Sequence, residues 1–170
     1  MHLKRWIFFG IPLLLGAVVA NFSPLNVLDF GWAKTIYRLA SIIFPAVVKM
    51  QGDYELGQVA KLYYSSIWIC FPLTFIGAYI DLQRQADVIV EKCREKKIFF
   101  ILFFCVFSLV CGFLLFNFTF ESKDVEDVRV YLSFHSRLGM SLVGAVAPIG
   151  ASAMIAMAAF GFRNIGRIFY

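Results

Sequence analysis

The chain has 170 residues, of which 61% are hydrophobic, and its mean hydropathy is +0.77. Soluble domains are about 45–50% apolar, so the composition excludes an ordinary soluble protein and indicates one membrane domain over residues 1–170. The net charge is +5, but the basic residues cluster beside apolar runs and are not interleaved with aromatic residues as in nucleic-acid binders. We therefore expect the lipid bilayer, and no nucleic acid, as a partner.

The first apolar run predicts a membrane span over about residues 6–22. Lys4 and Arg5 precede this run, and the residues after Ala20 extend it towards the roughly 20 residues that a span needs. The same run also fits a signal peptide, because the residues up to Ala20 resemble a cleavage site. We favour the retained span, with the cleaved signal peptide as the alternative.

An outer loop is expected over residues 23–62, with an amphipathic helix over about residues 31–50. The apolar face of this helix has spacings of four, three and four positions, at Trp32, Ile36, Leu39 and Ile43. Pro45 should end or bend the helix near Phe44. An apolar stripe with aromatic and basic neighbours is typical of an interfacial helix. We expect this helix to lie along the extracytoplasmic surface of the membrane or to pack on the outer face of the bundle.

Three further apolar runs predict spans over about residues 63–80, 98–118 and 138–162. The polar segments between these runs predict a cytoplasmic loop over residues 81–97 and an outer loop over residues 119–137. The pattern as a whole predicts an all-α membrane protein with four transmembrane helices and one amphipathic extracytoplasmic or interfacial helix.

The fourth run differs from the others because Gly, Ala and Ser dominate it. Small residues recur at helical spacing, which allows the backbones of neighbouring helices to approach closely. The predicted helix-packing interface consists of Ser141, Gly144, Ala145, Ala147, Pro148, Ala151, Ser152, Ala156 and Ala159. Two interpretations remain open at this point. The helix forms the centre of its own bundle, or part of its surface docks another membrane subunit or a second copy of the chain.

The distribution of basic residues predicts the orientation. Nine Lys and Arg residues fall on the side of the two termini and of the loop 81–97, close to the ends of the spans, whereas seven are spread over the other side. Basic residues are in excess in cytoplasmic loops. We therefore expect an integral protein of a bacterial inner membrane with both termini in the cytoplasm.

No Asp, Glu, Lys, Arg or His falls within the four predicted spans. Ionisable residues inside a membrane usually mark ion paths or proton relays, and an intramembrane protease needs paired acids or an activated nucleophile. The four cysteines lack the spacing of zinc ligands, and His135 has no second histidine at a similar depth with which to hold a haem. We therefore predict no catalytic residue, no cofactor and no metal site, in a protein that is not an enzyme.

These features predict a non-catalytic subunit or assembly component of a larger membrane complex of secretion, conjugation or respiratory type. Other subunits, or copies of the chain, would then bind through the fourth span. As an alternative, the layout resembles that of the immunity proteins against pore-forming colicins of the A and B type. Those proteins have four spans, cytoplasmic ends, a long first outer loop and a basic cytoplasmic loop, here residues 21–62 and 81–97. The resemblance lies in layout and in no motif, and it implies spans that recognise the pore-forming helices of a toxin.

Overall fold

The computed structural model describes residues 3–49, 55–116 and 136–169. Every regular element in these ranges is a helix. Three continuous helical stretches are long and apolar enough to cross a membrane, namely Gly57–Arg84, Ala86–Phe116 and Arg137–Phe169. In the described residues the expectation of an all-helical fold is therefore confirmed, with three helices rather than four that are long and apolar enough to span a membrane. The apolar part of the first helix, Ile7–Phe22, is shorter than these three.

Some of the predicted layout lies outside the described residues. The predicted outer loop 119–137 is described only at its last two positions, and the predicted third span only up to residue 116. The predicted amphipathic helix is described up to residue 49.

The helices follow one another with short interruptions. The first part of the chain contains α1 (Leu3–Phe22), the 3-10 turn η1 (Val27–Asp29), α2 (Gly31–Ile43) and α3 (Pro45–Lys49). The first long stretch consists of α4 (Gly57–Ile69) and α5 (Phe71–Arg84). The second contains α6 (Ala86–Cys93), the 3-10 turn η2 (Arg94–Lys96), α7 (Lys97–Phe100), the π-helical η3 (Ile101–Phe107) and α8 (Ser108–Phe116). The third consists of α10 (Arg137–Val143) and α11 (Val146–Phe169).

Proline accounts for two of the interruptions. Phe44 ends α2 in an extended conformation, with φ −115° and ψ 106°, because a proline disfavours helical geometry in the residue before it. Pro72 lies at the start of α5, where it lacks the N–H that would continue the hydrogen-bond ladder from α4. The Thr74 hydroxyl donates to the Phe71 carbonyl at 2.9 Å. At the α4–α5 junction itself, the Cys70 N–H donates to the Ile67 carbonyl at 3.0 Å, so part of the backbone near the missing bond stays paired, as is needed inside a bilayer.

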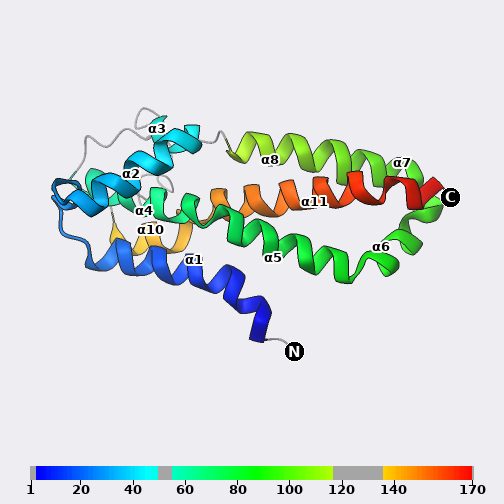
Figure 1. Cartoon of the computed structure of the whole chain (residues 1–170), viewed down its shortest axis with the longest axis horizontal. Coiled ribbons are helices and arrows are strands. Elements are labelled where there is room, and N and C mark those ends of the chain that lie inside the picture. Colours follow the sequence, from blue (N-terminus) through cyan, green and yellow to red (C-terminus); the bar gives the residue numbers. More distant parts are fainter. Residues whose placement is uncertain (1–2, 50–54, 117–135, 170) are drawn as a thin grey trace.

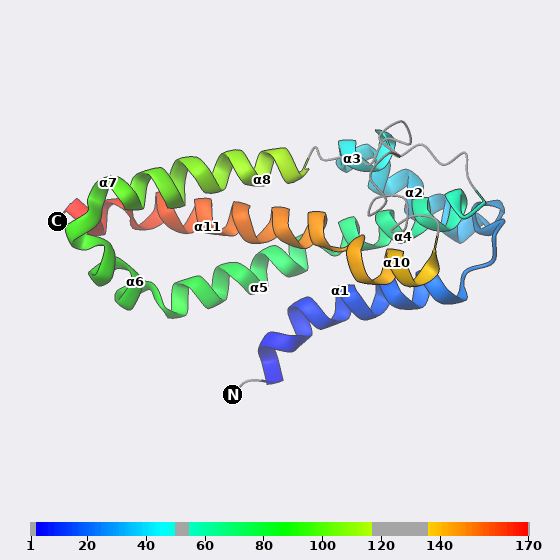
Figure 2. The ribbon, with the colours of Figure 1, turned by 180° about the vertical axis from the view of Figure 1, so that it is seen from behind.

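The helices form an elongated bundle with α11 at its centre (Figure 1). In the half that ends at the C-terminus, α11 lies between α5 and α8, and Figure 2 shows the same order from behind. In the other half, α1 packs on α4 and α10, and α2 packs on α4. No residue of α11 from Ala147 to Gly161 is exposed. The helix with the most small residues is thus the one that packs between two other long helices of the described chain.

Candidate helix-packing interfaces

The small residues predicted as a packing interface are in contact with the chain itself. Seven of them are buried, namely Gly144, Ala145, Ala147, Pro148, Ala151, Ser152 and Ala156. Ser141 and Ala159 are half-buried. The neighbours of α11 are α5, α8 and η3. The described structure therefore places most of this seam against neighbouring helices of the same chain.

Two glycines outside the predicted set mark the closest approach between α11 and the preceding long helix. A Cβ atom at Gly161 would lie 2.8 Å from Phe104 Cβ and 3.0 Å from the Phe104 carbonyl carbon. A Cβ atom at Gly112 would lie 2.7 Å from Ile155 Cγ1 and 3.2 Å from the Ile155 backbone nitrogen. Contacts this close bring backbone against backbone, which strengthens dispersion between membrane helices. The sequence signal for these contacts is a glycine inside an apolar run, but this signal does not tell which residue of another helix the glycine contacts.

Arg137 fastens the start of α10 to the end of α1. Its Nη1 group lies 3.0 Å from the Ala20 carbonyl oxygen, 2.9 Å from that of Asn21 and 2.9 Å from that of Ser23, and donates to them. The last carbonyls of a helix lack partners within the helix and carry its negative dipole end. A guanidinium group supplies hydrogen-bond donors for these carbonyls and a positive charge for the negative end of the dipole. Arg137 was predicted only as a charge of the outer loop, because its partners are more than 100 residues away in sequence.

Side-chain hydrogen bonds reinforce the same junction. The Asn21 amide nitrogen donates to the Ser141 hydroxyl at 3.0 Å and to the Ala17 carbonyl at 2.8 Å. The Ser141 hydroxyl donates in turn to the Arg137 carbonyl at 2.9 Å. Ser141 thus joins α10 to α1 by hydrogen bonding, in addition to being a small residue.

The apolar face predicted for α2 is mostly open. Trp32, Leu39 and Ile43 are 56%, 54% and 60% exposed, while Ile36 is half-buried. The residues of α2 that are buried in the bundle are the small ones, Ala33 and Ala40. The helix therefore has three sides: a small-residue side in the bundle, an open apolar side, and a polar side.

An aromatic cluster joins α2, α4, α5 and α8. The Phe44 ring centroid lies 5.0 Å from that of Trp68, 6.0 Å from that of Phe71 and 5.7 Å from that of Phe116. Trp68 and Phe116 meet edge to face at 5.3 Å, a favoured geometry for aromatic pairs. Trp68 is fully buried and Phe44 nearly so. This cluster was not predicted, because Phe44, the pair Trp68 and Phe71, and Phe116 come from three segments that are far apart in sequence.

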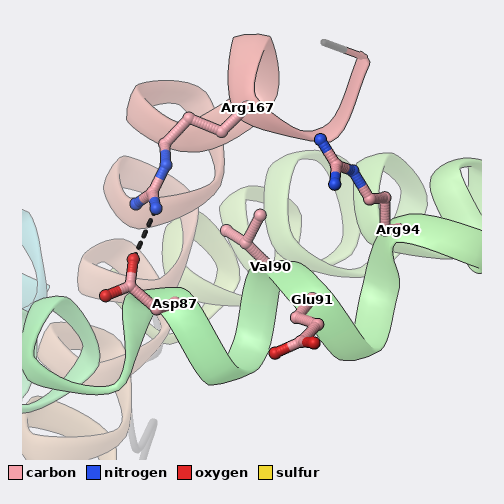
Figure 3. Close-up of a pocket in the computed structure, with 5 residues that line it drawn as sticks. All are labelled: Asp87, Val90, Glu91, Arg94 and Arg167. Carbon is pink, nitrogen blue, oxygen red and sulfur yellow. Dashed lines mark hydrogen bonds and ion pairs between the residues drawn. The ribbon is translucent and has the colours of Figure 1, made fainter.

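The opposite end of the molecule carries most of the described charges. An open cleft of about 460 Å³ lies between α6 and the last turns of α11, and Figure 3 shows the residues that line it, namely Asp87, Val90, Glu91, Arg94 and Arg167. Arg167 pairs with Asp87, and the Arg163 guanidinium donates to the Tyr79 hydroxyl at 3.0 Å. The Asp87 side chain is almost fully exposed, so this pair contributes little to stability. It does show that α6 folds back against the end of α11.

The described side chains that are buried in the bundle are uncharged. Where the structure describes the burial of a side chain, the buried polar residues are serines, a threonine and an asparagine. In residues 3–49, 55–116 and 136–169, no three His, Cys, Asp or Glu side chains gather as metal ligands would. The four cysteines are free thiols.

Comparison with known proteins adds no family to these observations. No family model matches the chain, and neither a curated protein nor a solved structure shows a significant similarity to it. The geometry of the helices is therefore the basis on which a function can be proposed.

Proposed function

We propose that this protein is a non-catalytic integral subunit or assembly component of a larger membrane complex, and that it acts through packing between helices. The observation that carries the proposal is the absence of buried charge from the described bundle, whose interior is made of small, aliphatic and aromatic side chains. Ionisable groups inside a membrane usually perform transport or catalysis. A bundle without them is suited to binding other apolar helices.

In this proposal, α11 is the helix around which the subunit folds, and partners bind to open faces of other helices. On α1, exposed apolar residues recur at intervals of three or four positions, at Ile7, Ile11, Leu14 and Val18. This spacing places them on one side of the helix. The side of α8 that faces away from α11 also exposes large residues, among them Phe113 and Leu114. Such surfaces accept either lipid or a partner helix.

Photo-crosslinking in native membranes, followed by mass spectrometry, tests the proposal. A photoreactive residue at Leu14, which is exposed on α1, should crosslink to another membrane protein. The same residue in place of Ala20, which is fully buried on α1, should give only crosslinks within the chain. A protein that is monomeric in mild detergent, with nothing co-purified and only lipid adducts at Leu14 and Phe113, would rule out the subunit function.

We further propose that α1 is a fourth span and that both termini lie in the cytoplasm of a bacterium. α1 has 20 residues, or about 30 Å of helix. It lies along the second predicted span, since a Cβ atom at Gly77 would be 2.4 Å from Phe8 Cβ and one at Gly16 would be 2.9 Å from Tyr63 Cε2. Topology reporters fused at the C-terminus and after Met50 should report opposite sides. Matching signals would disprove the four-span arrangement.

A second function is favoured by the central position of α11. A chain whose small-residue helix packs between helices of the same chain can fold without partners, as a free-standing immunity protein against a pore-forming toxin would. Expression of the chain in a sensitive bacterium should then raise survival under a pore-forming toxin of the colicin A and B type. A variant with Ala151→Leu, which disrupts the centre of the bundle, serves as the control. Equal killing with and without the intact chain would exclude this function.

A further inference from the structure

The segment that contains α2 and α3 runs along α4. Near the start of this segment, the Leu28 backbone N–H donates to Gln58 Oε1 at 3.0 Å. At the end of α2, the Phe44 ring lies 5.0 Å from the Trp68 ring. Gln58 and Trp68 are ten residues apart on one helix, which corresponds to about 15 Å along its axis. α2 therefore advances along α4 rather than crossing it (Figure 1).

The depth to which the end of α2 enters the membrane can be estimated from the charged residues that bound the uncharged stretch of α4 and α5. Lys61 and Asp81 enclose a stretch of α4 and α5 without a charged residue, and these two positions are about 30 Å apart along a helix. That distance equals the thickness of the hydrocarbon core of a bilayer. Phe71 is ten residues from each end of the stretch, and Trp68 is seven residues from Lys61. Since the Phe44 ring contacts both of these rings, it lies close to the middle of the membrane.

The composition of the segment agrees with this depth. Lys34 and Arg38 fall in the first part of α2, Lys49 ends α3, and the ten residues from Leu39 to Val48 between these charges carry none. Four of these ten are large, apolar and exposed, namely Leu39, Ile42, Ile43 and Val48, and Ile42 reaches 81% exposure. Contact of these side chains with water would be unfavourable by about 25 cal/mol per Å² of apolar area. Contact with acyl chains carries no such penalty.

The backbone at the break between α2 and α3 is also compatible with the interior of a membrane. Non-helical backbone is tolerated at membrane depth only where protein covers it and its polar groups are bonded. Phe44 is buried, its N–H donates to the Ala40 carbonyl at 2.8 Å, and its carbonyl accepts from the Val47 N–H at 3.0 Å. Pro45 has no N–H that would need a partner. The turn can therefore lie in hydrocarbon without leaving these groups unsatisfied.

We propose that α2 and α3 form a re-entrant element that enters one half of the bilayer, and that the acyl chains of that leaflet cover Leu39, Ile42, Ile43 and Val48. The long side chains of Lys34 and Arg38 can extend towards the headgroups from the shallow part of α2. This inference requires only that the described long helices cross the membrane. It is independent of the complex or toxin that the protein recognises.

Spin labels at two positions of α2 test the proposal in liposomes, with the four native cysteines replaced by alanine. Thr35→Cys and Ile42→Cys place labels at exposed positions seven residues apart, and thus on the same face of the helix. Power saturation with oxygen and with a water-soluble nickel chelate gives the depth of each label. A re-entrant α2 should place the label at 42 deeper than the label at 35 by about 10 Å, with high oxygen and low nickel accessibility at 42.

Two results would overturn the proposal. Equal depths at positions 35 and 42 would mean that α2 lies flat on the membrane surface. Low accessibility to both oxygen and nickel at position 42 would mean that protein rather than lipid covers this face. An unchanged thermal unfolding midpoint in both labelled proteins verifies that the labels leave the fold intact.

Discussion

The substitution Gly161→Ala tests whether backbone contact with η3 holds α11 in place. The added methyl group would lie 2.8 Å from Phe104 Cβ, 2.9 Å from Cys105 Sγ and 3.0 Å from the Phe104 carbonyl carbon. Two of these atoms belong to the backbone or adjoin it, so rotation of a flexible side chain cannot relieve the overlap. Overpacking of this kind costs about 1–3 kcal/mol.

Gly166→Ala is the matched control, because Gly166 lies five residues further along α11 and has no atom within 4 Å of an added Cβ. Alanine gains about 1 kcal/mol over glycine in a helix, and both variants share this gain. Their difference therefore isolates the steric term. We expect Gly166→Ala to be more stable than Gly161→Ala by about 1–3 kcal/mol.

A thermal assay with a thiol-reactive fluorophore measures this difference at the contact itself. Cys105 is buried beside Gly161, so its reaction reports the separation of η3 from α11 once Cys70, Cys93 and Cys111 have been replaced by alanine. The midpoint for Gly161→Ala should be about 2–12 °C below that of Gly166→Ala. Equal midpoints would refute the reasoning, because the two added methyl groups would then have met equivalent surroundings.

Three further predictions concern the remaining contacts. Ala151→Leu, at a fully buried position of α11, should destabilise the purified protein by about 1–3 kcal/mol, whereas Val146→Leu, at an exposed position of the same helix, should leave its unfolding midpoint unchanged. Arg137→Gln should lower stability by about 1–3 kcal/mol through loss of its bonds to α1, with Arg38→Gln on the polar side of α2 as the control. If both Arg variants unfold alike, the bonds between Arg137 and α1 carry no net stability. Asp87→Asn should change stability by less than about 1 kcal/mol because the ion pair is exposed. A larger loss would mean that the cleft of Figure 3 is less open to solvent than its geometry indicates.

The sequence by itself was enough to predict the class of protein. Long uncharged runs, such as the one that follows Lys97, can be recognised locally because the length and hydropathy of a run decide whether it can span a bilayer. The end of α2 near Phe44 could be predicted in the same way, since the effect of Pro45 acts on the preceding residue. The small residues around Ala151 likewise marked α11 as a packing helix before its partners were known.

Only the tertiary structure decided which faces meet. The sequence predicted the apolar face of α2 at Trp32, Ile36, Leu39 and Ile43. Which residues of α2 the bundle buries, namely Ala33 and Ala40, became known only from the structure. Hydrophobic patterning separates inside from outside in water, but a lipid-facing side and a buried side are both apolar in a membrane. The partners of Arg137 and Gly161 depend in addition on helices that approach from distant parts of the chain. The sequence pattern therefore does not determine which helices pair, and the tertiary packing of the bundle does.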